Sequence, residues 1–227
     1  MRIVELSQHR ALTGGFYTSD EAARILRIDN LSKIKRWLGN DRGDSVIARQ
    51  YGGADIGFYD LLELRFIAYF RRQGVSLQSI RRTALQLRND LNLQHPFAMS
   101  DVKFVTDRKR IFALAAETEN DQTLMEIVSG QHAMYDVIEE FLAKGIEFTT
   151  AGLAKSWQPD RARHPNVVLN PTRAHGQPVI DLAGVPTASL FSLYKAEHDY
   201  NAVAEWYEVD PVLVEQAVDY ELTLAAA

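Results

Sequence analysis

The chain of 227 residues contains no cysteine. This absence excludes disulfide bonds, thiolate nucleophiles and zinc sites built on thiolate ligands. Apolar residues never continue for the roughly 18 positions that a membrane-crossing helix needs. The start of the chain, Met1 to Leu6, has an early acid and no apolar segment after it, unlike a secretory signal. We therefore expect a soluble, cytoplasmic protein.

The sequence is also poor in the patterns that enzymes use. It has no Gly-rich phosphate-binding loop. The one tight group around a histidine, Glu197-His198-Asp199, has poor spacing for metal ligands because adjacent residues on a helix do not face one another. Ser129 and His132 lie three apart, but the sequence supplies neither an orienting acid nor an oxyanion hole. We predict that the protein is not an enzyme and binds no metal and no cofactor.

Charge is unevenly distributed along the chain. The net charge is −5, yet residues 1–95 hold 15 Lys+Arg against 10 Asp+Glu, whereas residues 96–227 hold 10 against 20. A basic half joined to an acidic half indicates one module for phosphates and another module for a different partner.

Two short helices are predicted near the start of the chain. Thr18 and Glu21 have the spacing of a capping box, and the apolar face at 22–26 follows it. Asn30 is expected to cap a second helix over 31–38 that ends at Gly39. Leu31, Ile34 and Leu38 of this second helix share one face, which leaves its cations elsewhere. Trp37 lies beside that face and is expected to be a core residue.

A capped helix, a turn and a second, basic helix form an arrangement that reads B-form DNA, because the major groove admits one α-helix. Residues 45–51 and 56–58 are predicted to form a hairpin that would lie beside neighbouring phosphates as a wing. The alternative is that Lys33, Lys35 and Arg36 form only the solvated face of a surface helix. The predicted contacts to double-stranded operator DNA are Ser32, Lys33, Lys35 and Arg36 on the helix, and Arg42, Arg49 and Gln50 on the hairpin.

The remaining pattern predicts an α+β fold that is mainly helical. A small C-terminal core is expected to be closed by Ala188, Phe191, Leu193, Val203, Trp206, Val209, Val214 and Val218. The other expected elements are helices at 60–74 (capped by Asp60), 76–91, 135–144, 187–197, 200–207 and 211–222, strands at 102–105, 111–115, 124–128 and 166–169, and a linker at 154–165.

The stretch from Phe16 to Gln94 resembles the winged helix-turn-helix domain of the MerR family of transcriptional regulators. The resemblance implies that Lys35 lies in the DNA-reading helix. The chain departs from the family in having Arg36 and Trp37 where paired aromatics are usual, and in a connecting helix that ends near Pro96, too early for the usual dimer coil. The matching residues are Tyr17-Thr18-x-x-Glu21-Ala22-Ala23, Ile34-Lys35-x-Trp37, Tyr59 to Ile67, and Gly74 to Ile80.

The stretch from about Asn166 to Glu221 resembles the antitoxin family known as domain of unknown function 433. The resemblance implies a small three-helix module. Longer relatives carry a MerR-like domain in front and are encoded beside PIN-like ribonuclease toxins, similar to VapBC pairs. The matching residues are His175 to Ile180, Gly184 to Thr187, Val203 to Tyr207 and Val214 to Tyr220, with Arg110-Ile111-Phe112 and Ser129-Gly130-Gln131 in the middle segment.

The sequence thus predicts three parts: a MerR-like winged helix-turn-helix at 1–95, a central strand and helix segment for dimerisation at 96–158, and an antitoxin-type three-helix domain at 159–227. Their joint function would be that of a VapB-like type II antitoxin that neutralises a PIN-like ribonuclease and represses its own operon, as a homodimer or higher assembly. Candidate contacts to the toxin are Arg161, Arg163 and Arg173.

Two alternatives stay open. The first is a one-component MerR-like regulator whose C-terminal domain binds a small ligand. The second is an adaptor that does not bind DNA, which predicts no salt-dependent retention on DNA.

Overall fold

The computed structural model describes residues 14–39, 45–51, 55–99, 104–130 and 144–225. Its fold is α+β and mainly helical, as predicted. The helices are α2 (Ser19–Leu26), α3 (Leu31–Leu38), α4 (Phe58–Arg72), α5 (Leu77–Leu91), α6 (Phe104–Thr118), α7 (Gln122–Ser129), α9 (Thr187–Glu197), α10 (Tyr200–Tyr207) and α11 (Pro211–Ala225), with short 3-10 turns η1 (Pro96–Ala98) and η2 (Ala174–Gly176). The strands are β1 (Ile146–Phe148), β2 (Ala154–Trp157), β3 (Val167–Leu169), β4 (Pro178–Ile180) and β5 (Val185–Pro186).

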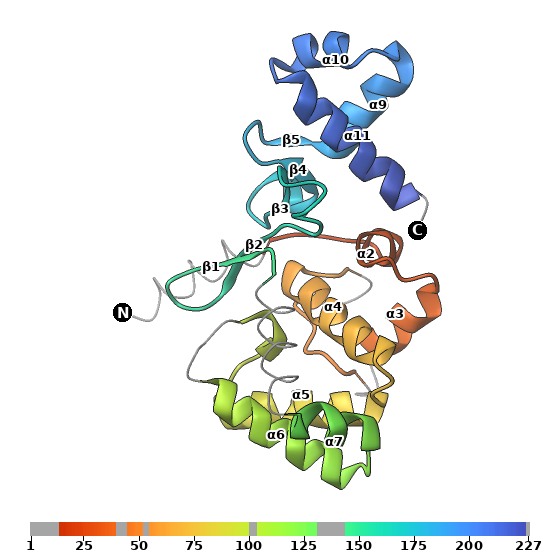
Figure 1. The fold of residues 1–227 in the computed structure, drawn as a ribbon. Coiled ribbons are helices and arrows are strands. Elements are labelled where there is room, and N and C mark those ends of the chain that lie inside the picture. Colours follow the sequence, from red (N-terminus) through yellow and green to blue (C-terminus); the bar gives the residue numbers. More distant parts are fainter. Residues whose placement is uncertain (1–13, 40–44, 52–54, 100–103, 131–143, 226–227) are drawn as a thin grey trace.

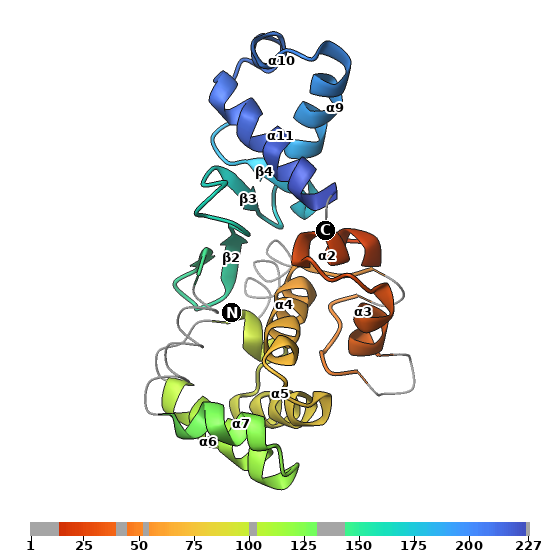
Figure 2. The same cartoon turned by 45° about the vertical axis from the view of Figure 1, so that its right-hand side comes forward.

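These elements follow one another along an elongated molecule (Figure 1). Helices α9, α10 and α11 form one end, α5, α6 and α7 form the other, and the sheet lies with α2–α4 between them, an order that also holds in the turned view (Figure 2). The five strands are antiparallel and pair in sequence order. The sheet therefore joins the middle of the chain to its C-terminal helices.

Local signals account for where the N-terminal helices begin. The Thr18 hydroxyl accepts from the amide of Glu21 at 3.2 Å, and the Glu21 carboxylate accepts from the amide of Thr18 at 2.7 Å, which confirms the capping box. Ser76 caps α5 as expected. The prediction that Asp60 is the N-cap of its helix is wrong, because α4 begins earlier and the Asp60 carboxylate reaches back to accept from the amide of Gly57 at 3.0 Å.

The predicted strands at 102–105, 111–115 and 124–128 are wrong wherever the structure describes these residues. Residues 104–118 and 122–129 form α6 and α7, since the buried side chains Ile111, Phe112, Ala115 and Ala116 follow helical spacing. The helix expected at 135–144 lies almost wholly outside the described residues.

The hairpin expected at 45–51 and 56–58 does not form in its described parts. Residues 45–51 contain no strand, and Ile56 pairs with Tyr17 instead, donating and accepting backbone hydrogen bonds of 3.0 and 2.9 Å. The linker expected at 154–165 is also wrong in its first part, because 154–157 form β2 and bury Trp157.

The three C-terminal helices are confirmed, and α11 continues to Ala225, past the expected end at 222. Their core is built from Leu190, Val203, Val214 and Val218, joined by Tyr220. A separate, larger core unites α2–α7 with β2. The two cores identify two packing units within the described part of the chain.

The two packing units meet at Tyr17. The Tyr17 hydroxyl donates to the carbonyl of Gly176 at 2.6 Å, and the amide of Phe16 donates to the carbonyl of His175 at 3.0 Å. Gly176 has a φ of +85°, and a Cβ there would lie 2.6 Å from the Tyr17 hydroxyl and 2.7 Å from the Cα of Gly15. Only glycine permits so close an approach with this backbone conformation.

We expect Tyr17→Phe to lower the free energy of unfolding by about 1–2 kcal/mol, because it leaves the carbonyl of Gly176 without its donor in a buried place. Urea denaturation measures the change. Tyr207→Phe is the matched control, since the Tyr207 hydroxyl makes no hydrogen bond to any described residue. Equal stability of Tyr17→Phe and the wild type would contradict a role for this bond in holding the two units together.

Two carboxylates are buried in α4. Asp60 and Glu63 are both 0% exposed. Burial raises the pKa of Asp60 to about 6, and it raises the pKa of Glu63 to about 8 although Arg88 lies 3.8 Å away and opposes the shift. The amide of Phe97 donates to Glu63 at 3.4 Å and also favours the charged form.

The raised pKa of Glu63 gives a pH dependence of stability with a defined sign. Glu63 keeps its proton in the folded protein, whereas the unfolded chain releases it near pH 4.5. The contribution of protonated Glu63 to the free energy of unfolding is therefore complete below pH 4.5 and is lost as the pH rises towards 8. We expect the free energy of unfolding of Glu63→Gln to equal that of the wild type near pH 4.5 and to exceed it by a few kcal/mol near pH 8.

Urea denaturation of both proteins between about pH 5 and pH 8 tests this expectation. Glu126→Gln, a change at an exposed carboxylate, is the control and should show no such trend. A difference between Glu63→Gln and the wild type that stays constant with pH would contradict the account.

Candidate nucleic-acid interface

Helices α2 and α3 are joined by residues 27–30. Arg27 ends α2 in the left-handed conformation, with φ 53°, and the amide of Ile28 donates to the carbonyl of Ala23 at 2.9 Å. Asn30 then caps α3, its side-chain oxygen accepting from the amide of Ser32 at 2.8 Å. These bonds set the direction in which α3 leaves the turn.

The buried side of α3 faces the larger core. Ile34, Trp37 and Leu38 are buried there, which confirms the prediction that Trp37 is a core residue. Because these three occupy one side of a two-turn helix, Lys35 and Arg36 are left exposed.

The three cations of α3 differ in their partners. Lys33 forms an ion pair of 2.7 Å with Asp29, and this hydrogen-bonded ammonium lowers the pKa of the Asp29 carboxyl. Lys35 and Arg36 have no hydrogen bond or ion pair to any residue that the structure describes. Ser32 is exposed, but its hydroxyl donates to Asn30 at 2.6 Å. Lys35 and Arg36 are thus the side chains of α3 that are free to contact phosphates or base edges.

The predicted wing residues do not form a comparable group. Arg42 lies outside the described residues. Arg49 donates from Nη2 to the carbonyl of Asp55 at 2.7 Å. Gln50 caps α4: its side-chain oxygen accepts from the amide of Tyr59 at 2.6 Å. The structure therefore uses Arg49 and Gln50 within the chain and does not bring them onto the exposed surface of α3.

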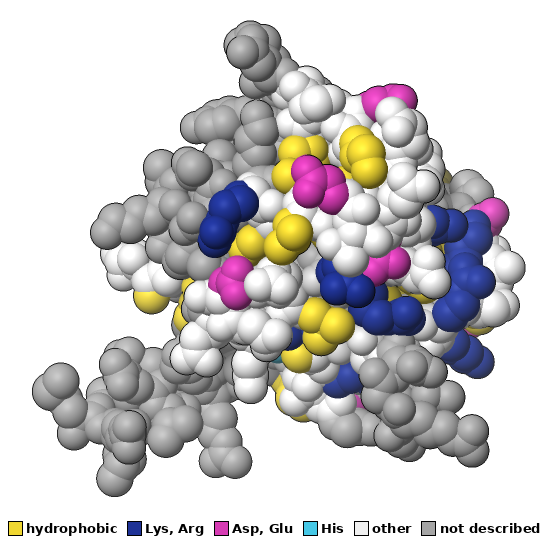
Figure 3. All heavy atoms as spheres, turned by 90° about the horizontal axis from the view of Figure 1, so that it is seen from below, with side chains coloured by type: hydrophobic (Ala, Val, Ile, Leu, Met, Phe, Trp, Pro, Cys, Tyr) yellow, Lys and Arg dark blue, Asp and Glu magenta, His cyan; other side chains and the backbone are white. Residues whose placement is uncertain are grey.

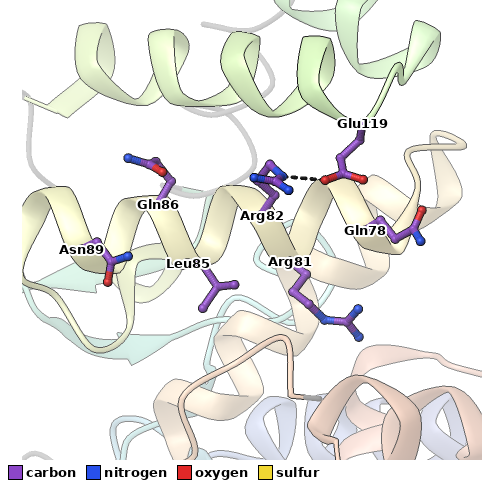
Figure 4. Close-up of a pocket in the computed structure, with 7 residues that line it drawn as sticks. All are labelled: Gln78, Arg81, Arg82, Leu85, Gln86, Asn89 and Glu119. Carbon is purple, nitrogen blue, oxygen red and sulfur yellow. Dashed lines mark hydrogen bonds and ion pairs between the residues drawn. The ribbon is translucent and has the colours of Figure 1, made fainter. Parts of the chain in front are cut away.

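A second polar surface lies along α5, and sequence reasoning missed it. The pocket there has a volume of about 440 Å³, and Arg82 forms an ion pair of 2.5 Å with Glu119 across it (Figure 4). Arg81 points to the opposite side of α5 from Arg82 (Figure 4). Seen from the α5–α7 end, Lys and Arg side chains gather along one side of the face (Figure 3). The adjacent pair Arg81-Arg82 is the signal in the sequence that could have indicated this surface.

The three candidate contacts to a toxin lie apart from α3. Arg163 is bound to Asp219, with two nitrogens each 3.0 Å from a carboxylate oxygen. Arg173 pairs with Asp181 at 2.6 Å. Arg161 is exposed and has no partner among the described residues. The structure therefore leaves Arg161 free and holds the other two in ion pairs.

Exposed apolar side chains mark the C-terminal helices. The prediction that Trp206 lies in the core is wrong: it is 75% exposed, because Val203 and Ala204 supply the buried side of α10. Val212, at the start of α11, is 55% exposed. Glu205, Glu208 and Asp210 beside them are exposed acids. We name Trp206, Val212 and these three acids the α10–α11 corner.

The described residues also bear on membrane and metal-binding classes of protein. None of the helices there combines the length and the apolar character that a membrane span requires. No group of three or more His, Asp or Glu side chains in these ranges is arranged to hold a metal ion.

Comparison with known proteins finds a similar mycobacterial sequence and a similar mycobacterial crystal structure. It is 29% identical over 174 residues to a protein of Mycobacterium tuberculosis (strain ATCC 25618 / H37Rv) named "Putative antitoxin VapB45", which covers 73% of this chain and 71% of that protein. Its fold is similar to the crystal structure of Rv2018 from Mycobacterium tuberculosis, with a TM-score of 0.69, 28% identity, and coverage of 89% of this chain and 96% of that one. No family model matches the chain.

Proposed function

We propose that this chain is a VapB-like antitoxin of a type II toxin–antitoxin pair. The observation that carries the proposal is the similarity to a protein named as a putative antitoxin over nearly three quarters of both sequences. The resemblance of residues 166–221 to domain of unknown function 433 supports the same function. The antitoxin acts by binding and not by catalysis, holds no cofactor, and works in the cytoplasm.

The toxin is a PIN-like ribonuclease, and it binds the α10–α11 corner. Residues 196–227 contain eight Asp+Glu and no Lys or Arg, so this end of the chain offers an acidic surface around an exposed tryptophan. A nuclease that binds RNA phosphates has a basic surface, which is complementary to the acidic surface around Trp206. Exposed Arg161 supplies an additional contact to the acidic active site of such an enzyme.

The N-terminal part, 1–95, is a MerR-like DNA-binding domain that represses the operon. Lys35 and Arg36 support this role, since both are exposed and without partners among the described residues. The central segment, 96–158, holds two copies together, and a dimer presenting two α3 helices selects half-sites about one helical turn apart, or a multiple of it.

Growth rescue tests the antitoxin function. The gene beside this one is expressed alone and then together with the wild-type chain. We expect growth arrest in the first case and recovery in the second. A neighbouring product that arrests growth equally with and without this chain would contradict the proposal.

The second function is a one-component regulator that responds to a small ligand. The pocket of about 760 Å³ beside Tyr59 could hold such a ligand, but its lining runs from Arg49 to Leu153 and lies outside the C-terminal domain in which the sequence placed the ligand site. The two functions differ in their partner. A regulator of this kind elutes from a purification column without a partner protein, whereas an antitoxin elutes together with its toxin.

A further inference from the structure

A large pocket opens where three distant segments meet. Its volume is about 760 Å³, within the range of small-molecule sites in proteins. Gln50 and Tyr51 form one wall, Tyr59 of α4 and His95 another, and Met99 and Leu153 close the third. Met99 and Leu153 are also joined as a β-bridge, so the third wall is held together by the backbone.

Three polar atoms of residues in this lining are buried without a hydrogen-bond partner among the described residues: the Tyr59 hydroxyl, Nε2 of Gln50 and Nε of Arg49. Nδ1 of His95 also makes no hydrogen bond to them, but it lies 3.9 Å from the Asp60 carboxylate. Tyr59 is 4% exposed and belongs to the lining. A buried polar group without a partner costs about 1–3 kcal/mol of stability, so a ligand that accepts hydrogen bonds from these groups would offset that cost.

The chemistry of these atoms is that of donors. The Gln50 side-chain oxygen already accepts from the amides of Tyr59 and Asp60, at 2.6 and 3.3 Å, and this fixes its NH₂ group as the free end. The guanidinium of Arg49 and the hydroxyl of Tyr59 are donors as well. His95 is neutral near pH 7, because burial and nearby Arg88 lower its pKa to about 4.

Among the described residues that line the pocket, Arg49 is a cation and none is Asp or Glu. Buried Asp60 lies behind this wall, where its carboxylate accepts from the amides of Gly57 and Gln50. The lining also holds apolar side chains, among them Met99 and Leu153, together with the amides of Asn92 and Gln94. The ring of Tyr51 stacks on that of Phe16, with ring centroids 4.6 Å apart.

We propose that this pocket binds a small organic carboxylate with a flat or apolar body. The carboxylate accepts hydrogen bonds from Gln50, Tyr59 and Arg49, and the body lies against Tyr51, Met99 and Leu153. The site is built from residues outside α3 and outside the α10–α11 corner, so the proposal goes beyond the antitoxin function and does not depend on it.

Calorimetric titration of the full chain with benzoate tests the proposal, with benzamide as the neutral analogue of the same shape. We expect benzoate to bind with a dissociation constant of millimolar or below and benzamide to bind at least about tenfold more weakly. Tyr59→Phe should weaken benzoate binding roughly tenfold or more, since it removes a hydrogen bond to a charged group. Leu153→Trp, which fills the pocket, should abolish binding.

Tyr220→Phe is the matched control. Its hydroxyl is likewise buried without a partner, but it belongs to the C-terminal core, and benzoate affinity should not change. Absence of benzoate binding up to about 10 mM would overturn the proposal. So would equal affinity for benzamide, or unchanged affinity in both Tyr59→Phe and Leu153→Trp.

Discussion

Replacing Lys35 and Arg36 together by alanine is expected to lower the affinity for operator DNA by at least about 30-fold. A cation that contacts a base edge contributes about 1–3 kcal/mol, and one that contacts a phosphate contributes to the salt dependence. Both side chains are exposed and make no ion pair with any described residue, so removing them leaves the fold intact. Lys33→Ala should have a smaller effect, because the ammonium of Lys33 is already paired with Asp29 at 2.7 Å.

An electrophoretic shift with the promoter upstream of the chain's own gene, repeated at several salt concentrations, measures these effects. The salt slope should fall by about one for each phosphate that the variant no longer neutralises. The matched control removes an exposed cation from α9, at the end of the molecule formed by α9–α11, by Lys195→Ala, and should leave DNA binding unchanged. If the α3 double variant binds as tightly as this control, α3 is not the DNA-reading helix.

Trp206→Ala is expected to weaken the complex with the toxin by about 30-fold or more. An exposed tryptophan ringed by polar groups is the typical anchor of a protein interface, and truncating such an anchor costs about 2 kcal/mol or more of binding free energy. The free chain should keep its stability to within about 0.5 kcal/mol, because the side chain is 75% exposed and packs little against its own fold.

Copurification of the toxin with each variant measures the weakening. Leu114→Ala serves as the control, since it removes an apolar side chain that is 52% exposed but lies on α6, at the opposite end of the molecule. Undiminished recovery of toxin with Trp206→Ala would place the interface elsewhere on the chain.

The sequence predicts best those elements that local chemistry determines. Helices α2, α3 and α10 begin where a capping side chain is present and end where a left-handed residue or glycine follows, and α9 also ends at a left-handed residue, His198. Helices α6 and α7 are mistaken for strands because short runs of Val, Ile and Phe suit either state until the longer spacing of buried residues is considered.

The sites are harder to predict, for two physical reasons. An apolar residue on an amphipathic helix has the same spacing whether it fills a core or faces a partner, so Trp206 cannot be distinguished from its buried neighbours by sequence. Contacts between distant segments have no local signal: Tyr17 meets Gly176, and the pocket joins Gln50 to Leu153. By contrast, the exposure of Lys35 and Arg36 follows directly from the helical period of their neighbours.

The central claim is that this chain neutralises a toxin by forming a complex with it. The most direct test is coexpression with the neighbouring gene, followed by determination of the mass of the species that elutes with this chain. The account predicts one species whose mass is a whole-number combination of the two chains, and its disappearance with Trp206→Ala. A wild-type chain that elutes without the neighbouring product, although that product is folded and present, would contradict the account.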